Sequence, residues 1–300
     1  MTASLRRWLD SHHSAGVAEG DPRHIDVLRL MPFIGVHVAC LAVPFVGISP
    51  TAVVLAVTLY VVRMFGITAG YHRHFSHRAF SAPRWVSFLF AVLGNASGQR
   101  GPLWWAAHHR HHHRHSDDES DLHSPRQHGF WWSHLGWFLA DGAYRTRLEL
   151  VPDLAARPEL MWLDRFDAVV PALLGAGCLA LGWWLGLHGW DTSGPQLLVW
   201  FCISTVVLAH ATFSVNSVMH VWGTRPFPTR DDSRNNALIA VLVLGEGWHN
   251  NHHHNQGSVR QGFRWWQFDP TWYALVVFSW LGLVHKLRPL PASLRGMSHS

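Results

Sequence analysis

Charged residues are scarce in this sequence of 300 residues. They make up 14% of it, whereas apolar residues make up 48%, and an average soluble protein is about 25% charged. The length would allow one or two ordinary domains, but this composition argues against two soluble ones. The formal net charge is +5, which suits nucleic acid or an anionic membrane face. No Lys/Arg-rich run contains interleaved aromatic residues, so we expect no nucleic-acid partner.

Cysteine is also rare. Cys40, Cys178 and Cys202 lie far apart in apolar runs and show no CxxC spacing, so we expect them to be small buried apolar side chains. The N-terminal sequence MTASLRRWLD has no apolar core after its arginine pair, which predicts no cleavable signal peptide. The cysteines say little about the redox compartment of the protein.

Two residue types are abundant instead: there are 18 tryptophans and 25 histidines. Tryptophan favours the boundary between water and lipid, where the ring is buried and the N–H stays hydrated. Histidine at this density needs a separate explanation, and metal binding is the first to consider.

Four apolar stretches are long enough to cross a bilayer, which takes roughly 20 residues. They are Leu30–Ile48, Thr51–Gly70, Ala168–Trp190 and Leu197–Met219. Short loops join them into two helical hairpins. The sequence therefore predicts an all-α integral membrane protein with four transmembrane helices. Its membrane domain spans residues 30–285, between an N-terminal segment (1–29) and a C-terminal tail (286–300).

Arginine placement predicts the orientation of these spans. Neither hairpin loop carries a basic residue, whereas the N-terminal segment contains Arg6, Arg7, Arg23 and Arg29. Segments 71–167 and 220–285 are also rich in arginine. We expect them to form a cytoplasmic cap, with both termini on the same side of the membrane. Arg63 lies inside the second span, where it either snorkels to the cytoplasmic surface or has an inward-facing polar role.

Three histidine-rich segments stand beside the predicted spans, all on one side: GYHRHFSHR, HHRHHHRH and GEGWHNNHHH. Two of them contain the spacing i, i+3, i+4, which places three side chains on one face of a helix. These are His109, His112 and His113 in the second segment, and His249, His252 and His253 in the third.

Two further pairs flank the spans. Asn216 and His220 are four residues apart, so a helix projects them from one face. His72 and His77 are five apart, and an ideal α-helix would separate them by about 140°. They should then reach different metal ions, or the helix should unwind between them.

Neutral imidazole suits iron, zinc, copper or nickel. This many histidines exceed what one ion can hold, whereas two ions with four or five ligands each fit the count. A soluble ferritin-like di-iron bundle needs two Glu-x-x-His pairs. Only Glu246 with His249 has that spacing, so this soluble class is disfavoured.

The ordered motifs HxxxxH, HxxHH and HxxHH resemble the membrane fatty acyl desaturases of the stearoyl-CoA desaturase type, especially bacterial and plant acyl desaturases. The text GITAGYHRHFSHR, SRNNALIAVLVLGEGWHNNHHH and RQGFRWWQFDPTWY is similar to that family as well. The resemblance covers about residues 30–285. His74, His108, His111, His115 and His254 match no ligand position.

The resemblance implies a mushroom-like fold, in which four membrane helices stand under a cytosolic cap that holds two iron ions. It implies the ligands His72, His77, His109, His112, His113, His220, His249, His252 and His253, with Asn216 acting through water. The implied reaction uses O₂ to place a cis double bond, at the delta-9 position, in a saturated acyl chain. The implied electron donor is external: a ferredoxin, a rubredoxin, a cytochrome b5 or a flavin reductase. The implied location is a bacterial inner membrane.

Some positions depart from the animal acyl-CoA desaturases. Ala107 and His108 replace an Arg-Asp pair that helps to hold CoA, and Asp141 and Gly142 replace an Arg-Lys pair. The acyl carrier therefore stays open between CoA and a glycerolipid. No HPGG haem motif is present, so we expect no fused cytochrome b5 domain.

The substrate tail should enter an apolar tunnel below the metal ions. Tyr60 and Ala56 lie on the second span, roughly 18–24 Å below His72 at 1.5 Å per residue, and we expect them to close the tunnel. Candidate tunnel walls are Trp104, Trp105 and Trp265. Candidates for orienting the imidazole ligands are Glu246, Asp231, Asp232 and Asn250.

Two alternative functions remain at this point. A related di-iron lipid hydroxylase would use the same ligands but add an oxygen atom to the acyl chain. A histidine-rich metal transporter would place its ligands at mid-membrane, whereas these histidines stand beyond the ends of the spans.

Overall fold

The computed structural model describes residues 10–12, 23–25 and 27–296. Within these ranges the chain is helical, and its β-type pairing consists of isolated bridges without a strand. The predicted all-α class is confirmed for this part of the protein. Arg6 and Arg7, most of the N-terminal segment and the last four residues of the tail lie outside the described ranges.

Three helical segments are long and apolar enough to cross a membrane: residues 50–76, 169–187 and 194–220. The first consists of α4 (Pro50–Phe65) and the π-helix η1 (Gly66–Ser76). The second is α12 (Val169–Leu187), and the third is α13 (Gly194–Asn216) followed by the 3₁₀ turn η4 (Val218–His220). They correspond to the second, third and fourth predicted spans. Ser49 and Ser193 cap α4 and α13, because each hydroxyl accepts a hydrogen bond from the backbone N–H three residues later.

The first predicted span differs from expectation, because residues 30–48 do not form one helix. The chain forms α2 (Val27–Cys40), breaks at residues 41–42 and resumes as the short α3 (Val43–Val46). Pro44 explains the break, since it has no N–H to donate to the carbonyl of Cys40. The 14 residues of α2 reach about 21 Å, less than the roughly 30 Å hydrocarbon core.

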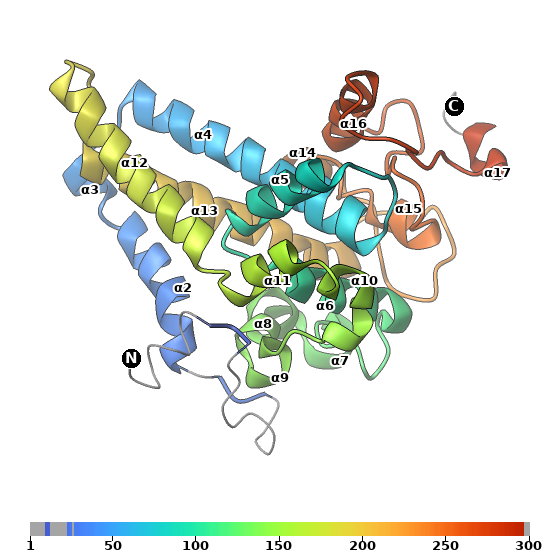
Figure 1. Ribbon diagram of the computed structural model, residues 1–300. Helices are drawn as coiled ribbons and strands as arrows, with labels where there is room; N and C mark the ends of the chain where they lie inside the picture. Colours follow the sequence, from blue (N-terminus) through green and yellow to red (C-terminus); the bar gives the residue numbers. More distant parts are fainter. Residues whose placement is uncertain (1–9, 13–22, 26, 297–300) are drawn as a thin grey trace.

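The long helices pack side by side, with α13 between α12, α4 and α2 (Figure 1). Their far ends are tied together, because the Ser49 hydroxyl donates to Oε1 of Gln196 at 2.8 Å. Arg63 is 1% exposed, and its guanidinium donates to the hydroxyls of Ser204 and Thr205 at 2.7 Å. Arg63 therefore faces inward and connects α4 to α13 instead of snorkelling.

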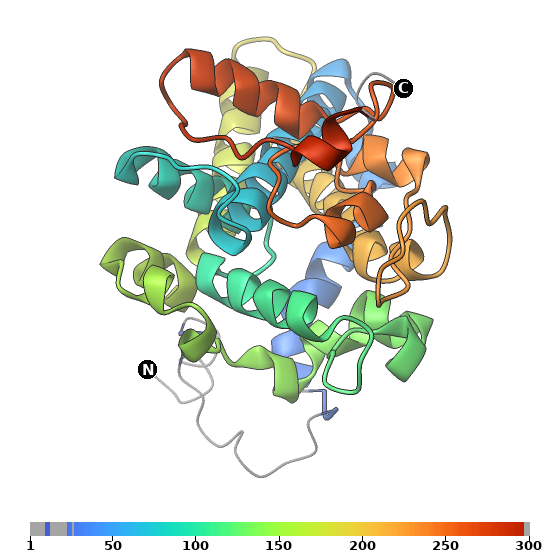
Figure 2. The same ribbon diagram turned by 90° about the vertical axis from the view of Figure 1, so that its right-hand side faces the viewer.

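Shorter helices surround α6, which crosses the middle of Figure 2, and most of them belong to the segments predicted to form the cap. The larger ones are α5 (Arg84–Asn95), α6 (Pro102–His115), α11 (Pro158–Arg165) and α16 (Pro270–Trp280). The shorter ones are α7 (Pro125–His128), η2 (Trp132–Gly136), α8 (Trp137–Leu139), α9 (Asp141–Tyr144), η3 (Leu148–Leu150), α10 (Pro152–Ala155), α14 (Ala237–Leu242), α15 (His249–His254) and α17 (Ala292–Arg295).

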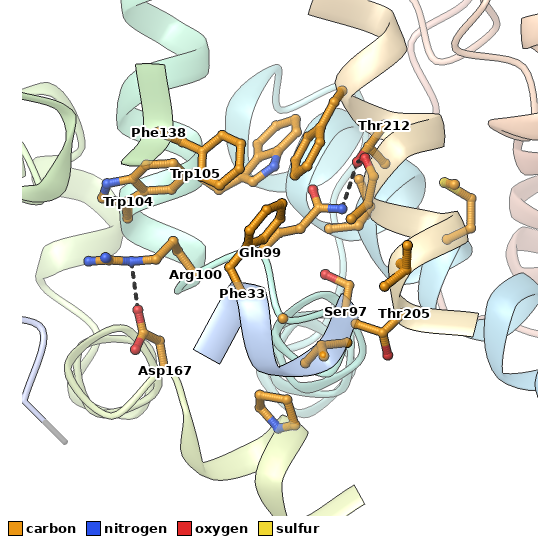
Figure 3. A pocket seen from close by; sticks show the side chains of 18 of the residues that line it. Phe33, Ser97, Gln99, Arg100, Trp104, Trp105, Phe138, Asp167, Thr205 and Thr212 are labelled. Carbon is orange, nitrogen blue, oxygen red and sulfur yellow. Dashed lines mark hydrogen bonds and ion pairs between the residues drawn. The ribbon is translucent and has the colours of Figure 1, made fainter. Parts of the chain in front are cut away.

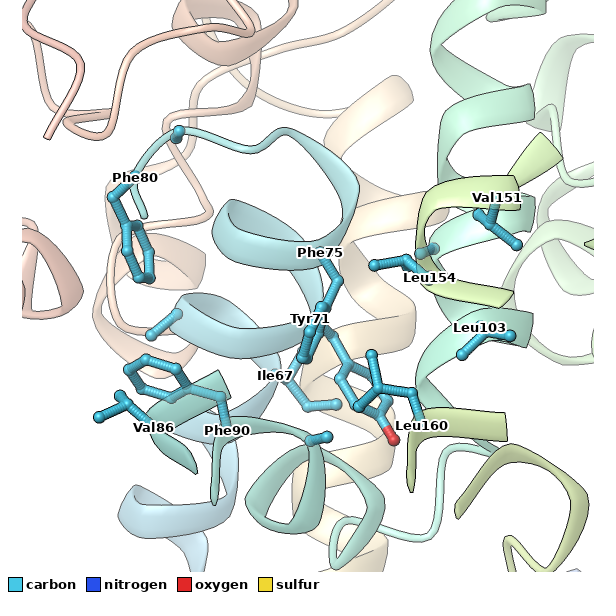
Figure 4. Close-up of a cluster of buried hydrophobic side chains, with 14 of the residues drawn as sticks. Ile67, Tyr71, Phe75, Phe80, Val86, Phe90, Leu103, Val151, Leu154 and Leu160 are labelled. Carbon is cyan, nitrogen blue, oxygen red and sulfur yellow. The ribbon is translucent and has the colours of Figure 1, made fainter. Parts of the chain in front are cut away.

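An apolar cluster fixes η1 within the cap (Figure 4). Tyr71 and Phe75 of η1 are buried among Phe90 of α5 and residues of α6 and α11. Gly94 permits this contact, since a Cβ atom there would lie 2.3 Å from the Tyr71 ring. The packing holds the histidine-bearing end of η1 in place.

Candidate metal centre

The π-helix η1 resolves the spacing of the first histidine pair. The N–H of His77 donates to the carbonyl of His72 at 3.1 Å, a bond that joins residues five apart. The two side chains therefore lie above one another instead of being splayed. Of the two possibilities for this pair, different metal ions or an unwound helix, the structure shows the unwound helix.

The nine predicted histidine ligands form two adjacent groups. In each group the candidate ligand nitrogens all lie within 4.8 Å of one another. The five-histidine group consists of His72, His77, His109, His113 and His252; the four-histidine group consists of His112, His220, His249 and His253. Each group converges on one point, as the ligands of a metal ion must.

The helices α6 and α15 contribute to both groups in a reciprocal way. In α6 the i, i+4 pair His109 and His113 joins the five-histidine group, and His112 joins the other. In α15 the i, i+4 pair His249 and His253 joins the four-histidine group, and His252 joins the five-histidine group. The repeated i, i+3, i+4 spacing thus places the two histidine groups side by side between these two helices.

The distances between the ring nitrogens fit metal ligation. His109 Nε2 lies 2.7 Å from His77 Nε2 and 3.0 Å from His113 Nε2. His252 Nε2 lies 3.1 Å from His72 Nε2 and 3.0 Å from His113 Nε2. Imidazole nitrogens bind at about 2.0–2.1 Å, so two ligands at right angles stand about 3.0 Å apart.

Carboxylates hold the opposite ring nitrogens of four ligands. The Nδ1 atom of His112 lies 3.0 Å from Asp121, that of His220 lies 2.9 Å from Asp117, and that of His253 lies 2.7 Å from Asp231. In His72 it lies 2.7 Å from Glu246. A proton on Nδ1 leaves the lone pair of Nε2 pointing into the group.

One unpaired ring nitrogen supports a cation site in the four-histidine group. Nε2 of His253 is buried and has no hydrogen-bond partner among the described residues. A buried, unpaired acceptor is costly, whereas a metal ion in the four-histidine group would satisfy it. The residues present therefore fit a pair of nitrogen-ligated ions.

Burial keeps most of these imidazoles neutral, which is the form that binds metal. Burial and the neighbouring imidazoles hold the pKa of His109, His113, His249 and His252 well below its usual range. Burial lowers the pKa of His253 to about 4, although Asp231 opposes the shift.

A cavity of about 690 Å³ adjoins the two groups, within the usual size range of ligand sites. At one end it is lined by His72, His109, His112 and His249, and at the other by apolar residues of α2, α12 and α13. Figure 3 shows its polar contacts: Gln99 donates to the Thr212 hydroxyl at 2.6 Å, and Nε of Arg100 lies 2.8 Å from Asp167. The lining, apolar residues beside a group of histidines, suits a long apolar chain that approaches the candidate metal centre.

Residues 48–284 match the family model described as fatty acid desaturase. The chain is 38% identical to "Acyl-CoA 5-desaturase AL21" of Anemone leveillei over 91% of its own length and 83% of that protein. It is 36% identical to "Delta-9 acyl-lipid desaturase 2" of Arabidopsis thaliana, covering 92% of the chain and 87% of the relative. It is 34% identical to "sn-1 stearoyl-lipid 9-desaturase" of Anabaena variabilis, covering 91% and 97%.

The chain belongs to the fatty acid desaturase family. It is therefore an enzyme, an oxidoreductase of lipid metabolism. The histidine groups of this desaturase lie within the part that matches the family model.

The other residues predicted for the metal centre fall in different places. Asn216 lines the cavity beside the four-histidine group. Glu246 and Asp231 contact ligand histidines as described above. The Asn250 side chain instead binds the backbone of Phe227 and so holds the loop before α14.

The residues predicted for the tunnel separate in the same way. Trp104 and Trp105 line the cavity. Tyr60 and Ala56 are not among its lining residues: the Tyr60 hydroxyl donates to the Leu242 carbonyl, and the Ala56 carbonyl accepts from Ser204. Trp265 is 65% exposed and lies outside the lining as well.

Sequence reasoning missed three carboxylates that hold the centre. Asp117 and Asp121 follow directly after α6, in the acidic run SDDESD, and that position was the available signal. Asp269 binds Arg73 of η1 at 2.9 Å, and Arg73 also binds Glu246 at 2.9 Å. Only the fold brings these buried charges together.

The desaturase also contains histidines that belong to neither group. The Nε2 atoms of His37 and His210 lie 3.1 Å apart. Nδ1 of His210 in turn lies 3.0 Å from Nε2 of His134. These contacts connect α2, α13 and η2.

Proposed function

We propose that this desaturase holds one iron ion in each histidine group and introduces a cis double bond, at the delta-9 position, into a saturated acyl chain carried on CoA or on a lipid. The balanced reaction converts –CH₂–CH₂–, O₂, two electrons and two protons into –CH=CH– and two molecules of water. The observation that carries this proposal is the pair of adjacent histidine groups at one end of an apolar cavity.

The iron pair would supply the O₂-dependent oxidant that removes hydrogen from an unactivated methylene, which side chains alone cannot do. The protein's contribution is binding and position. The apolar walls between α2, α12 and α13 exclude water from the acyl tail. The Gln99–Thr212 hydrogen bond adds a fixed polar point on the wall beside the chain. Asn216 faces the same space and could hold a water molecule there.

The delta-9 position is supported by relatives named as 9-desaturases, two of which cover nearly the whole chain. Other relatives are named for positions 5 and 7, so the position must come from how deeply the chain enters the cavity. The relatives' names include both acyl-CoA and acyl-lipid substrates, and both carriers belong to the proposal.

A four-span topology with both termini cytoplasmic is part of this proposal. His24 and Ile25 contact residues 140–141 of the cap, whereas Ser49 contacts Gln196 at the opposite end of α13. These contacts, and the packing of α2 and α3 against α13, support a first span that runs from α2 to α3. Arginine-rich caps and basic-free hairpin loops support a cytoplasmic cap. A bacterial inner membrane is the proposed location.

The test is expression in a host that cannot make unsaturated lipids, followed by mass spectrometry of its lipids and acyl-CoA pools. We expect acyl chains that have lost two hydrogens, with the double bond after carbon nine. The variant His113→Ala should give saturated chains only. A product that has gained one oxygen would instead identify the hydroxylase, and unchanged chains in iron-replete, aerated cells would refute both.

A further inference from the structure

The edge of the acyl cavity can be located from its exposed lining residues. Alanine has a single side-chain carbon, so an alanine that both lines the cavity and is exposed marks the edge. Ala172 and Ala176 of α12 meet both conditions, and so does Pro32 of α2. The cavity therefore has a rim formed by α12 on one side and by α2 on the other.

The helix α13 forms the floor between these two helices. Both α2 and α12 pack along α13 but hardly on each other (Figure 1). The lining residues of α13 recur every three or four positions, which places them on one face. They include Phe201, Thr205, Ala209, Thr212 and Asn216. The cavity thus follows α13 toward the four-histidine group.

The rim faces the hydrocarbon of the membrane. The helix α12 is one of the segments that can cross a membrane, and α2 contains a shorter apolar helix. Large apolar side chains are exposed next to the rim: Leu173 on α12, and Met31 and Ile34 on α2. An exposed apolar surface of this kind is typical of contact with lipid. The space between α2 and α12 therefore opens to lipid and not to water.

The rim is wide enough on the α12 side for a chain to pass. The lining residues of α12 itself are all small: Pro171, Ala172, Gly175 and Ala176. Membrane helices are tilted by only about 20° on average from the bilayer normal, so the acyl tail of a neighbouring lipid lies roughly parallel to α13. Such a tail can enter sideways between α2 and α12 without threading end first.

Polar groups meet the cavity where α12 begins. Nε of Arg100 lies 2.8 Å from Asp167, the pair drawn in Figure 3, and the guanidinium lies 4.0 Å from the centroid of the Tyr144 ring. The ester group of a lipid belongs at such a boundary between apolar spans and polar residues.

The charge of the lining disfavours a nucleotide carrier. Among the described residues that line the cavity, Arg100 is the only arginine or lysine, and Asp167 neutralises it. The phosphates of CoA call for cationic partners, which this lining does not supply. A glycerolipid needs none inside the cavity, because its head group stays at the membrane surface.

We propose that the acyl chain reaches the metal centre as an ester of a membrane glycerolipid, which slides sideways into the cavity between α2 and α12. The inference rests on the proposed function, because it takes this cavity as the acyl site. It decides between the two carriers that the proposed function includes. The ester bond stays intact, and Ala172, Ala176 and Pro32 form the entrance.

The experiment uses the purified, iron-loaded desaturase in vesicles of dioleoylphosphatidylcholine that contain phosphatidylglycerol with deuterated stearoyl chains. CoA is absent, so the chains cannot change carrier. The enzyme is reduced with dithionite and mixed with O₂, and the intact lipids are analysed by mass spectrometry. We expect stearoyl chains that have lost two deuterium atoms while still esterified to glycerol. A parallel assay offers stearoyl-CoA with vesicles of phosphatidylcholine alone.

Variants of the rim test the route. Ala172→Trp should lower desaturation of the lipid-linked chain about tenfold, because the indole overfills the rim, and Ala176→Trp should act in the same way. Gly177→Trp is the matched control, since it lies on α12 but faces open space and does not line the cavity. Native mass spectrometry should show less phosphatidylglycerol retained by the two rim variants than by the control, and this readout needs no turnover.

Desaturation of stearoyl-CoA alone would overturn the proposal. So would equal lipid desaturation and equal lipid retention in the rim variants and the control. If neither substrate is desaturated but the rim variants still retain less lipid, the proposed function is refuted and lateral entry is supported.

Discussion

At the scale of single residues, each imidazole is controlled by what its second nitrogen contacts. Carboxylates fix His72, His112, His220 and His253, whereas Nδ1 of His252 has no partner among the described residues. The four-histidine group therefore has three carboxylate-held ligands, and the five-histidine group has one. The histidines of the four-histidine group should therefore be the more rigid and the more basic of the two sets.

Removing one ligand of the four-histidine group should empty that site alone. We expect His253→Ala to lower the iron content from about two ions per chain to about one. The four-histidine group is left with only three imidazoles, whereas the five-histidine group keeps all of its ligands. His254→Ala is the control, since that ring stacks on Phe227 and belongs to neither group. Iron is measured by mass spectrometry of the purified proteins, and loss of both ions or of neither would contradict the assignment.

The buried histidines also make stability depend on pH. Burial lowers the pKa of His108 and of His123 to about 3, against about 6.5 in the unfolded chain. Below pH 6.5 the unfolded chain binds protons that the folded chain excludes, so stability falls as the pH falls. At pH 5 each residue should cost about 2 kcal/mol.

Thermal unfolding of the metal-free protein tests this dependence. Its midpoint should be similar at pH 8 and pH 7 and clearly lower at pH 5, and His108→Phe should reduce the difference. A midpoint that is the same at pH 8 and pH 5 would show that these rings are not buried as described.

At the scale of elements, η1 depends on one buried ion network. Arg73 is 1% exposed and binds both Glu246 and Asp269. Arg73→Met would leave two buried carboxylates without their cationic partner, so we expect a loss of about 3–5 kcal/mol. Arg84→Met, at an exposed ion pair, should change stability little. Chemical unfolding in detergent measures both, and equal stability of the two variants would contradict the role of the network.

The helix α12 should help to set how long an acyl chain the cavity accepts. Gly175 lines the cavity opposite Phe201, and a Cβ atom there would lie 3.2 Å from that ring. Gly175→Leu should therefore shift the products toward shorter chains. Gly177→Leu, two residues away and facing open space, should not. Gas chromatography of the products measures the chain-length profile. An unchanged profile in Gly175→Leu would show that this part of α12 does not limit the length of the acyl chain.

Sequence periodicity predicted the elements that carry a strong local signal. Three spans and the i, i+3, i+4 histidine faces are set by neighbours on one helix, so their spacing is visible in the sequence. The break before Pro44 and the π-helical turn between His72 and His77 were harder to predict, because the spacing of residues was interpreted on an ideal α-helix in both places. The contacts of Asp117 with His220 and of Arg73 with Asp269 join segments far apart in the chain, and no local pattern encodes them.

At the scale of the whole molecule, the two ends of the fold have separate tasks. The apolar helices line a cavity beside the candidate metal centre, whose histidines come from η1, α6, η4 and α15. The tunnel-closing role of Tyr60 and Ala56 stays a prediction, although the cavity is lined by their neighbour Met64 and by Gly175.

The central claim is that nine histidines hold two ions beside this cavity. Anomalous diffraction at the iron absorption edge, from crystals of the iron-loaded protein, tests it most directly. The account predicts two peaks, one within the five-histidine group and one within the four-histidine group, with Asp117, Asp121 and Asp231 behind the second. A single peak, or iron bound away from these imidazoles, would contradict it.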